Sequence, residues 1–252
     1  MDEATAQRLI EEQQRYYRAR APEYDDWWLR RGQYDLGEET NVLWRADLAE
    51  LEQALERFAP RGDVLELAAG TGLWTRHLAR FADHLTAVDA APETLELNRG
   101  RVGGAVEYVA ADLFAWEPDR LYDACFFGFW LSHVPSTRFA EFWRLVDRAL
   151  KPDGRVLFVD NATQFPGLGT RPTGEESVLR RVADGREFEI VKRFYEPAWL
   201  EQELATLGWR ATVEVTANGA FLCGSAVREP ADALAERRAD IVVHVELRAE
   251  QG

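Results

Sequence analysis

Apolar residues recur along this chain in two patterns, one typical of buried strands and one typical of helices. Short apolar runs bounded by turn residues indicate strands buried on both faces, as in a parallel sheet. Five runs of this kind cover residues 64–67, 85–89, 105–110, 122–129 and 155–160. Helix-period segments lie between them. Strands that alternate with helices at this spacing imply right-handed crossovers, so we expect an α/β fold with a doubly wound, mostly parallel, Rossmann-like sheet.

Two helix-period segments precede the first strand, at residues 3–20 and at about 40–58. Pro22 ends the first of them, because the residue before a proline is pushed out of the helical region. Between the two helices, residues 24–28 are dense in aromatic side chains. This stretch is typical either of a helix packed on the domain or of a lid over a ligand crevice. We assign residues 1–60 to a helical N-terminal lid.

After the fifth strand, residues 161–190 form a long, glycine-containing connection of the kind that covers or binds ligands. We expect a short helix within it, near residues 175–181. Its basic residues, at 180–186 and 192–193, indicate either a charged surface hairpin or an arginine site for an acidic acceptor. The Asp-Gly pair at 184–185 favours the hairpin.

The last part of the chain completes the sheet and then changes in composition. A helix is expected at residues 196–207, followed by strands at 209–216 and 220–227 around an Asn-Gly hairpin signal. The sheet therefore has seven strands, with an antiparallel last strand, in a domain that spans residues 61–228. Residues 229–252 form a charged tail, in which we expect a helix at 231–239 and, at 241–245, either a short strand or a contact with a partner.

Composition narrows the range of functions. The formal net charge of −14 gives a nucleic-acid substrate no electrostatic support. No apolar run approaches the roughly 20 residues that span a membrane, and the acidic first residues lack a secretory core, so a cytoplasmic location is expected. The two cysteines, Cys125 and Cys223, lie in apolar runs, which indicates buried thiols rather than a metal site or a disulfide framework.

Residues 64–75 carry the clearest chemical signal. A buried strand ends here in a Gly-x-Gly turn at Gly70 and Gly72, and a helix-period pattern follows. Glycines let the backbone turn sharply and let a ligand approach, and the helix N-terminus offers free N–H groups. A dinucleotide fingerprint needs a third glycine where this chain has Thr75. Glu66 would repel a pyrophosphate, but it suits a ligand with an ammonium group or ribose hydroxyls, and S-adenosylmethionine has both.

Acidic residues end the next two strands, at the edge where ligands of open α/β sheets bind. Asp89, at the end of the second strand, can accept both ribose hydroxyls. Asp112, just after the third, can accept the adenine amino group, with the Leu113 N–H facing a ring nitrogen. Leu73, Ala90 and Leu113 would then sandwich the purine.

In their order and spacing, these elements resemble the class I S-adenosylmethionine-dependent methyltransferases of the small-molecule type, over residues 64–227. Residues 66–72 match the first motif of that family, with Ala68 in place of its usual first glycine. Residues 127–135 look like the segment after the fourth strand, although Ser132 stands where many members have the first histidine of a pair. The turn expected before the fifth strand, at residues 151–154, is also similar.

The resemblance implies S-adenosyl-L-methionine as the cofactor and a set of residues around it. The implied cofactor-binding residues are Tyr24, Glu66, Ala68, Gly70, Gly72, Trp74, Asp89, Ala90, Ala111, Asp112, Leu113, Gly128 and Phe129. Tyr17, Trp130 and Asn161 are the expected acceptor contacts. Packing in the core is an equally good explanation for Trp130.

His133 is the candidate catalytic residue, a general base for a hydroxyl acceptor, because it lies at the mouth of the sheet and its pKa is ordinarily near the working range. Packing at the start of a helix is its alternative role. Arg20 is a candidate partner for the cofactor's carboxylate, with an ordinary solvated arginine as the alternative. No metal is expected.

We therefore expect an enzyme that transfers a methyl group from S-adenosylmethionine to an oxygen or nitrogen atom of a small-molecule acceptor. Two alternatives keep the cofactor: other chemistry, such as that of a cyclase, and a non-catalytic sensor or scaffold role. A nicotinamide dehydrogenase shares the glycine turn but would not need Asp112. No nucleic-acid or membrane partner is expected. The sequence leaves the oligomeric state open, with a homodimer as one option.

Overall fold

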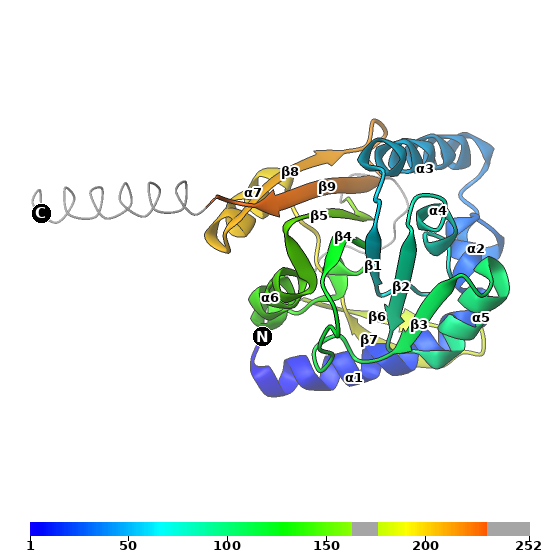
Figure 1. The fold of residues 1–252 in the computed structure, drawn as a ribbon. Helices are drawn as coiled ribbons and strands as arrows, with labels where there is room; N and C mark the ends of the chain where they lie inside the picture. Colours follow the sequence, from blue (N-terminus) through cyan, green and yellow to red (C-terminus); the bar gives the residue numbers. More distant parts are fainter. Residues whose placement is uncertain (163–175, 231–252) are drawn as a thin grey trace, which may run out of the picture.

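Seven strands form one sheet in the order β3-β2-β1-β4-β5-β9-β8 in the computed structural model of the chain (Figure 1). The strands are β1 (Asp63–Leu67), β2 (His84–Asp89), β3 (Val106–Ala110), β4 (Tyr122–Gly128), β5 (Leu150–Asn161), β8 (Trp209–Val215) and β9 (Phe221–Arg228). The structure describes residues 1–162 and 176–230. Strand β9 runs antiparallel to both of its neighbours, β5 and β8, while β1 to β5 pair in parallel. The predicted sheet with its antiparallel last strand is confirmed.

Helices cover both faces of this sheet. They are α1 (Glu3–Arg20), α2 (Tyr24–Trp28), α3 (Glu38–Phe58), α4 (Thr75–Leu78), α5 (Pro92–Val102), α6 (Phe139–Ala149) and α7 (Pro197–Thr206). Side chains of α6 and α7 pack on one face, and those of α3, α4 and α5 pack on the other. Helix α1 crosses the end of the molecule near β6, β7 and α5 (Figure 1).

Each face has its own aromatic core, which is why the strands are apolar on both sides. On the α6 side, Phe127 and Phe158 stack with their ring centroids 5.5 Å apart, and Trp143 packs edge-on against both. On the α3 side, the Trp44 ring meets Phe221 edge-on at 4.5 Å. The two cores hold the sheet between two layers of helices.

A separate two-stranded sheet stands beside α1. It consists of β6 (Ser177–Arg181) and β7 (Glu187–Val191), paired antiparallel. The hairpin predicted around the Asp-Gly turn is confirmed, while the short helix expected near 175–181 is wrong for residues 177–181, whose backbone groups pair with β7 instead. Glu189 of β7 ties this hairpin to α1, since its N–H donates to Glu12 at 2.7 Å and its carboxylate bridges Arg8 at 2.9 Å.

The turn expected at residues 151–154 lies inside β5, because Leu150 already pairs with Tyr122 before a shift in register. The helix and strand expected in the tail after residue 230, and the part of the connection between residues 163 and 175, lie outside the described residues.

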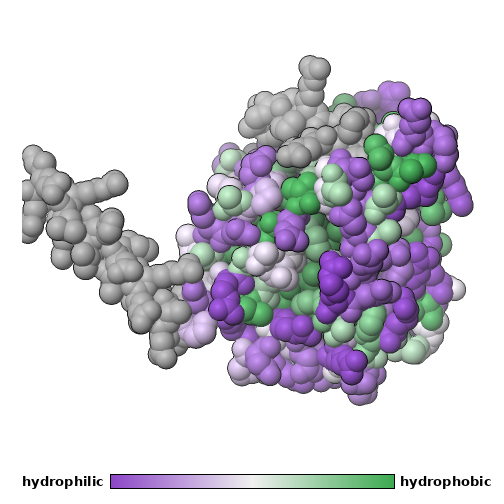
Figure 2. Space-filling view, turned by 90° about the horizontal axis from the view of Figure 1, so that it is seen from above, coloured by the Kyte–Doolittle hydropathy of each residue, from purple (hydrophilic) through white to green (hydrophobic). Residues whose placement is uncertain are grey.

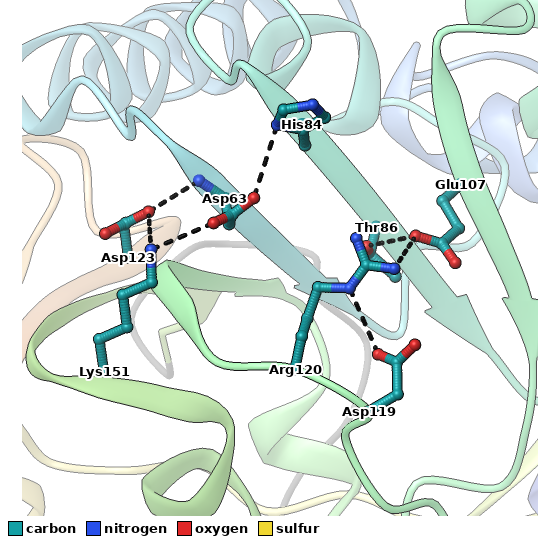
Figure 3. A network of polar contacts seen from close by, with 8 residues as sticks. All are labelled: Asp63, His84, Thr86, Glu107, Asp119, Arg120, Asp123 and Lys151. Carbon is teal, nitrogen blue, oxygen red and sulfur yellow. Dashed lines mark hydrogen bonds and ion pairs between the residues drawn. The ribbon is translucent and has the colours of Figure 1, made fainter.

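Polar side chains tie the strands together at their amino ends, opposite the end where ligands of such sheets bind (Figure 3). Lys151 donates to Asp63 at 3.1 Å and to Asp123 at 2.8 Å. Arg120 pairs with Glu107 at 3.1 Å on the other side of this edge. These contacts link β1, β3, β4 and β5, and we assign them a purely structural role.

A buried carboxylate joins α3 to the turn between β8 and β9. The Asp47 side chain is fully buried and accepts hydrogen bonds from the hydroxyl of Thr216 at 2.6 Å, the side-chain amide of Asn218 at 2.7 Å and the backbone N–H of Ala220 at 2.9 Å. Buried charged groups persist where hydrogen bonds satisfy them. Asp47 therefore fixes the last hairpin against a helix that lies about 170 residues earlier in the chain.

The surface is mainly hydrophilic on the side seen from above, with hydrophobic residues gathered toward its middle (Figure 2). Among the helices that the structure describes, none has the length and apolar character needed to cross a bilayer.

Candidate active site

A pocket opens at the carboxyl ends of β1 to β4, beneath α1. We call it the glycine-loop pocket. The residues that line it are Ile10, Gln13, Gln14, Tyr17, Tyr24, Ala68, Gly70, Thr71, Asp89, Ala90, Ala91, Thr94, Asp112, Leu113, Gly128, Phe129, Trp130 and His133. This is the predicted edge of the sheet.

The turn after β1 has a left-handed backbone at three positions, with φ of 55° at Ala68, 54° at Gly70 and 88° at Gly72. Glycine adopts such angles without strain, whereas an alanine in this region costs roughly 1 kcal/mol. A Cβ on Gly72 would lie 2.5 Å from the side-chain oxygen of Asn98. The left-handed backbone at position 68 explains why the similar family usually has a glycine there, and Ala68 adopts this conformation at an energetic cost.

Asp89 organises the pocket from the end of β2. One carboxylate oxygen accepts the Gly70 N–H at 2.8 Å, and the other accepts the Ala91 N–H at 2.8 Å and the Thr94 hydroxyl at 3.2 Å. Burial raises the pKa of this carboxyl, and the hydrogen bonds oppose that shift. The oxygen that accepts the Gly70 N–H keeps room for a further donor, since a carboxylate can accept about four hydrogen bonds.

Helix α1 closes the pocket from above through Asp112. The Gln14 amide donates to one Asp112 oxygen at 3.0 Å, and the Phe114 N–H donates to the other at 3.0 Å. The Gln13 amide donates to the carbonyl of His133 at 3.2 Å. The N-terminal helix thus contacts the residue predicted to accept the adenine amino group.

Glu66 lies deeper than the glycine-loop pocket. It lines a smaller neighbouring cavity together with Leu73 and Trp74, and one of its oxygens has no hydrogen-bond partner among the described residues. Burial raises the pKa of Glu66 to about 8, although the Thr75 hydroxyl opposes the shift. An unpartnered buried acid beside the pocket fits a ligand that carries a cationic group, either directly or through water.

The elevated pKa gives a testable pH dependence. Because the pKa of Glu66 is higher in the folded protein than the roughly 4.3 of an unfolded chain, its neutral form is favoured by folding. Its stabilising contribution is complete below that unfolded value and is lost as the pH rises toward 8. Glu66→Gln should therefore gain thermal stability relative to the wild type between pH 4.5 and 8, measured as melting temperature. Equal melting curves for both proteins across this range would contradict the assignment.

His133 and Tyr17 form a hydrogen-bonded pair at one side of the pocket. The single helical turn Leu131–His133 after β4 places the ring, and its Nδ1 lies 2.7 Å from the carbonyl of Val191, so Nδ1 carries the proton. Nε2 is then free to accept the Tyr17 hydroxyl at 2.8 Å. Burial lowers the pKa of His133 well below its usual range, and the charges of Lys192, Arg180 and Arg20 lower it further. The imidazole is therefore neutral at physiological pH.

A second pocket meets the first at this pair. We call it the cationic pocket. Its lining residues are Tyr16, Tyr17, Arg20, Tyr24, Trp27, Arg30, Tyr34, Leu36, Phe129, His133, Asn161, Leu179, Arg180, Arg181, Ile190, Lys192 and Phe194. They come from the N-terminal helices, the ends of β4 and β5, and the β6–β7 hairpin.

The structure brings most of the predicted site residues together. In the glycine-loop pocket lie Tyr17, Tyr24, Ala68, Gly70, Asp89, Ala90, Asp112, Leu113, Gly128, Phe129, Trp130 and His133. Trp130, expected at the acceptor, lines this pocket and not the cationic one, because its ring packs toward Phe114 and Phe142.

Some predicted site residues lie outside the glycine-loop pocket, among them Gly72, Ala111 and Asn161. Gly72 shapes the turn, and the Ala111 N–H donates to the backbone oxygen of Asp89 at 3.0 Å. Asn161 lines the cationic pocket, where its side-chain oxygen accepts a hydrogen bond from Lys192 at 2.8 Å.

Sequence reasoning did not predict Gln13, Gln14 or Thr94 as site residues. A signal was present for Gln13, which is a polar residue on the buried face of α1. Lys192 was also expected on a surface hairpin, whereas its side chain is only 4% exposed and its ammonium group lies 3.7 Å from the carboxylate of Asp160. Its flanking apolar residues, Ile190 and Val191, were the available sign of burial.

Comparison with known proteins agrees with this geometry. The sequence model of a family described as a methyltransferase domain matches residues 64–154. A demethylmenaquinone methyltransferase of Clavibacter sepedonicus is 36% identical over 160 aligned positions, and the alignment covers 59% of this chain and 63% of that protein. A ubiquinone biosynthesis O-methyltransferase of Xanthomonas axonopodis pv. citri (strain 306) is 30% identical over 63% of this chain and 67% of its own length.

Solved structures extend the likeness to nearly the whole fold. The complex of DhpI with SAH is 41% identical, superposes with a TM-score of 0.71, and covers 88% of this chain and 98% of its own. A complex of DhpI with SAM and HEP is also 41% identical, with a TM-score of 0.73, and covers 87% and 97%. The glycine turn, the acidic residues at the strand ends and these relatives together show that the chain belongs to the class I S-adenosylmethionine-dependent methyltransferases.

Proposed function

We propose that this protein transfers the methyl group of S-adenosylmethionine to an oxygen atom of a small-molecule acceptor. The observation that carries the proposal is the meeting of the two pockets. Four residues, Tyr17, Tyr24, Phe129 and His133, line both of them. A cofactor in the glycine-loop pocket and an acceptor in the cationic pocket would face each other across these side chains, as a direct transfer requires.

The residues of the glycine-loop pocket fit the cofactor. Asp89 would hold the ribose hydroxyls, Asp112 and the Leu113 N–H would hold the adenine edge, and Glu66 would face the methionine end from below. S-adenosylmethionine, when bound, supplies an electrophilic methyl group to a nucleophile placed in line with it. The protein's part is to orient both partners and to exclude water, and α1 does this by covering the pocket.

His133 is the proposed general base. Its Nδ1–H is held by the carbonyl of Val191, so Nε2 presents a lone pair toward the boundary of the two pockets. The Tyr17 hydroxyl occupies that lone pair, and burial raises its pKa well above the usual range, so it stays a neutral donor. An acceptor hydroxyl can lose its proton to Nε2 directly, by displacing Tyr17, or through the Tyr17 oxygen.

A nitrogen acceptor is the second candidate for the methylated atom. It is less well supported, because an amine that is protonated at neutral pH would enter a pocket lined by arginine and lysine side chains. The cytoplasmic location stays a prediction of the sequence.

Product analysis tests the proposal. The protein is incubated with S-adenosylmethionine and a panel of small hydroxylated and amino compounds, and the products are analysed by mass spectrometry. We expect one product heavier by one methylene unit, formed in step with S-adenosylhomocysteine, with the methyl group on oxygen. Binding of S-adenosylhomocysteine without any turnover across the panel would instead support the sensor or scaffold alternative.

A further inference from the structure

The cationic pocket has a charge opposite to that of the whole protein. The chain carries a net charge of −14, yet no aspartate or glutamate of the described part of the chain is among the pocket's lining residues. Its basic lining residues are Arg20, Arg30, Arg180, Arg181 and Lys192. A concave site of one sign concentrates ions of the other.

Two of these five cations already have partners. Arg181 is exposed and pairs with Glu187 at 2.9 Å. The Lys192 ammonium donates to the Ser132 hydroxyl and to Asn161, both at 2.8 Å, and lies near the buried carboxylate of Asp160. Neither cation therefore needs a ligand.

The other three have no carboxylate within ion-pair distance among the described residues. Arg20 is 9% exposed and its Nε has no hydrogen-bond acceptor, while Arg30 is 6% exposed with both Nε and one terminal nitrogen unpartnered. Aromatic rings surround them: Arg20 lies 5.0 Å from the centre of the Tyr24 ring, and Arg30 lies 4.1 Å from that of Trp44. Ring faces hold a guanidinium in place but do not neutralise it.

Arg180 adds a guanidinium group from a different element. It belongs to β6, while Arg20 ends α1, so the hairpin and the N-terminal helix each present a guanidinium group to the same pocket. The positive charges of both arginines reach His133, whose pKa they help to lower. Both groups therefore act on the place where the proposed reaction occurs.

From this arrangement we infer that the acceptor carries an oxyanion, of the carboxylate or phosphate type, which the guanidinium groups of Arg20 and Arg180 bind beside Tyr17 and His133. This inference rests on the proposed function, since it names the chemical class of that reaction's acceptor. Guanidinium groups are suited to such ligands because their planar donors match carboxylate and phosphate oxygens. Once paired with the guanidinium groups, the oxyanion would also hold the acceptor in a fixed position relative to the Tyr17 hydroxyl.

The carboxylate of the cofactor is a competing partner for Arg20, because Tyr24 beside it lines both pockets. The cofactor's carboxylate does not account for Arg180, because Arg180 lines the cationic pocket and not the glycine-loop pocket. Arg180 is therefore the residue that separates acceptor binding from cofactor binding.

The test uses the full chain and two variants of the hairpin, Arg180→Gln and the control Arg186→Gln, whose side chain is exposed, pairs with Asp184 and does not line the cationic pocket. Melting temperature is followed while sodium phosphate, sodium acetate or tetramethylammonium chloride is added at constant ionic strength, with and without saturating S-adenosylhomocysteine. We expect a saturable rise with at least one anion and none with the cation. Arg180→Gln should weaken the binding of that anion about tenfold or more, because a charged hydrogen-bonding partner is lost, while Arg186→Gln leaves it unchanged.

The arms separate the possible failures. A response to phosphate alone or to acetate alone identifies which oxyanion the pocket takes. No saturable response to either anion in the wild type, or an equal response in Arg180→Gln, would overturn the inference even if S-adenosylhomocysteine stabilises all three proteins. Absence of stabilisation by S-adenosylhomocysteine would instead count against the proposed function, and unchanged affinity of Arg180→Gln for it shows that this variant is folded.

Discussion

Asparagine in place of Asp89 is expected to weaken the binding of S-adenosylhomocysteine about 100-fold. The carboxylate accepts the N–H groups of Gly70 and Ala91 and the Thr94 hydroxyl, and it keeps capacity for a ribose hydroxyl on the oxygen that accepts Gly70. An asparagine amide would turn one of its acceptors into a donor, so that one side faces an N–H group without a partner. Hydrogen bonds to charged groups contribute about 1.5–3 kcal/mol each, so the loss of one or two accounts for this factor. Calorimetric titration measures the change.

Glu93→Gln is the matched control for this variant. Glu93 lies in the first turn of α5, close in sequence to Asp89, and its side chain is exposed. It should bind S-adenosylhomocysteine as the wild type does, and NAD should bind to neither protein. If Asp89→Asn kept the affinity of the wild type, the assignment of the ribose site to the end of β2 would have to be abandoned.

Replacement of His133 by asparagine is expected to lower kcat by a factor of about 100 or more, because a general base commonly contributes 10²–10⁴. The asparagine amide can still donate to the carbonyl of Val191, in place of Nδ1–H, but it lacks a counterpart of Nε2. Binding of S-adenosylhomocysteine should change little. Steady-state kinetics together with calorimetry separates the two effects.

The pH profile of the same reaction adds a second readout. His133 is buried and faces Lys192, Arg180 and Arg20 as well as Tyr17, and burial with these cations lowers its pKa well below the usual range. The base is therefore neutral already at mildly acidic pH, and kcat should stay level from about pH 6 to 8 instead of falling near 6.5. If His133→Asn kept full activity, or if the control His77→Asn lost all activity, the proposed role of His133 as the general base would be excluded.

Local patterns predicted the regular elements well. The apolar run at 64–67 and the helical period at 3–20 have nearly the bounds of β1 and α1, because burial on both faces or on one stripe imposes a simple repeat. Strand β6 was missed because its residues alternate weakly between half-buried and exposed positions. It is a strand only because β7 pairs with it, and pairing leaves little trace within one segment.

The candidate site divides in the same way. The glycine turn and the acids at 89 and 112 could be predicted, because each is tied to the end of a strand within a few residues. The pairing of Tyr17 with His133 joins positions 116 residues apart, and the sequence named both without indicating that they touch. Arg20 and Arg180 are still farther apart, so no spacing rule could place them in one pocket.

The bond between α3 and the last hairpin has a consequence for how the chain is made. Asp47 and Trp44 leave the ribosome long before Ala220 and Phe221, their partners across the sheet. Until translation reaches β9, the nascent chain displays an apolar helix face beside a carboxylate that has no donors. Such a surface is what molecular chaperones bind. Stalling or truncation before β9 would thus leave part of the α3 face exposed.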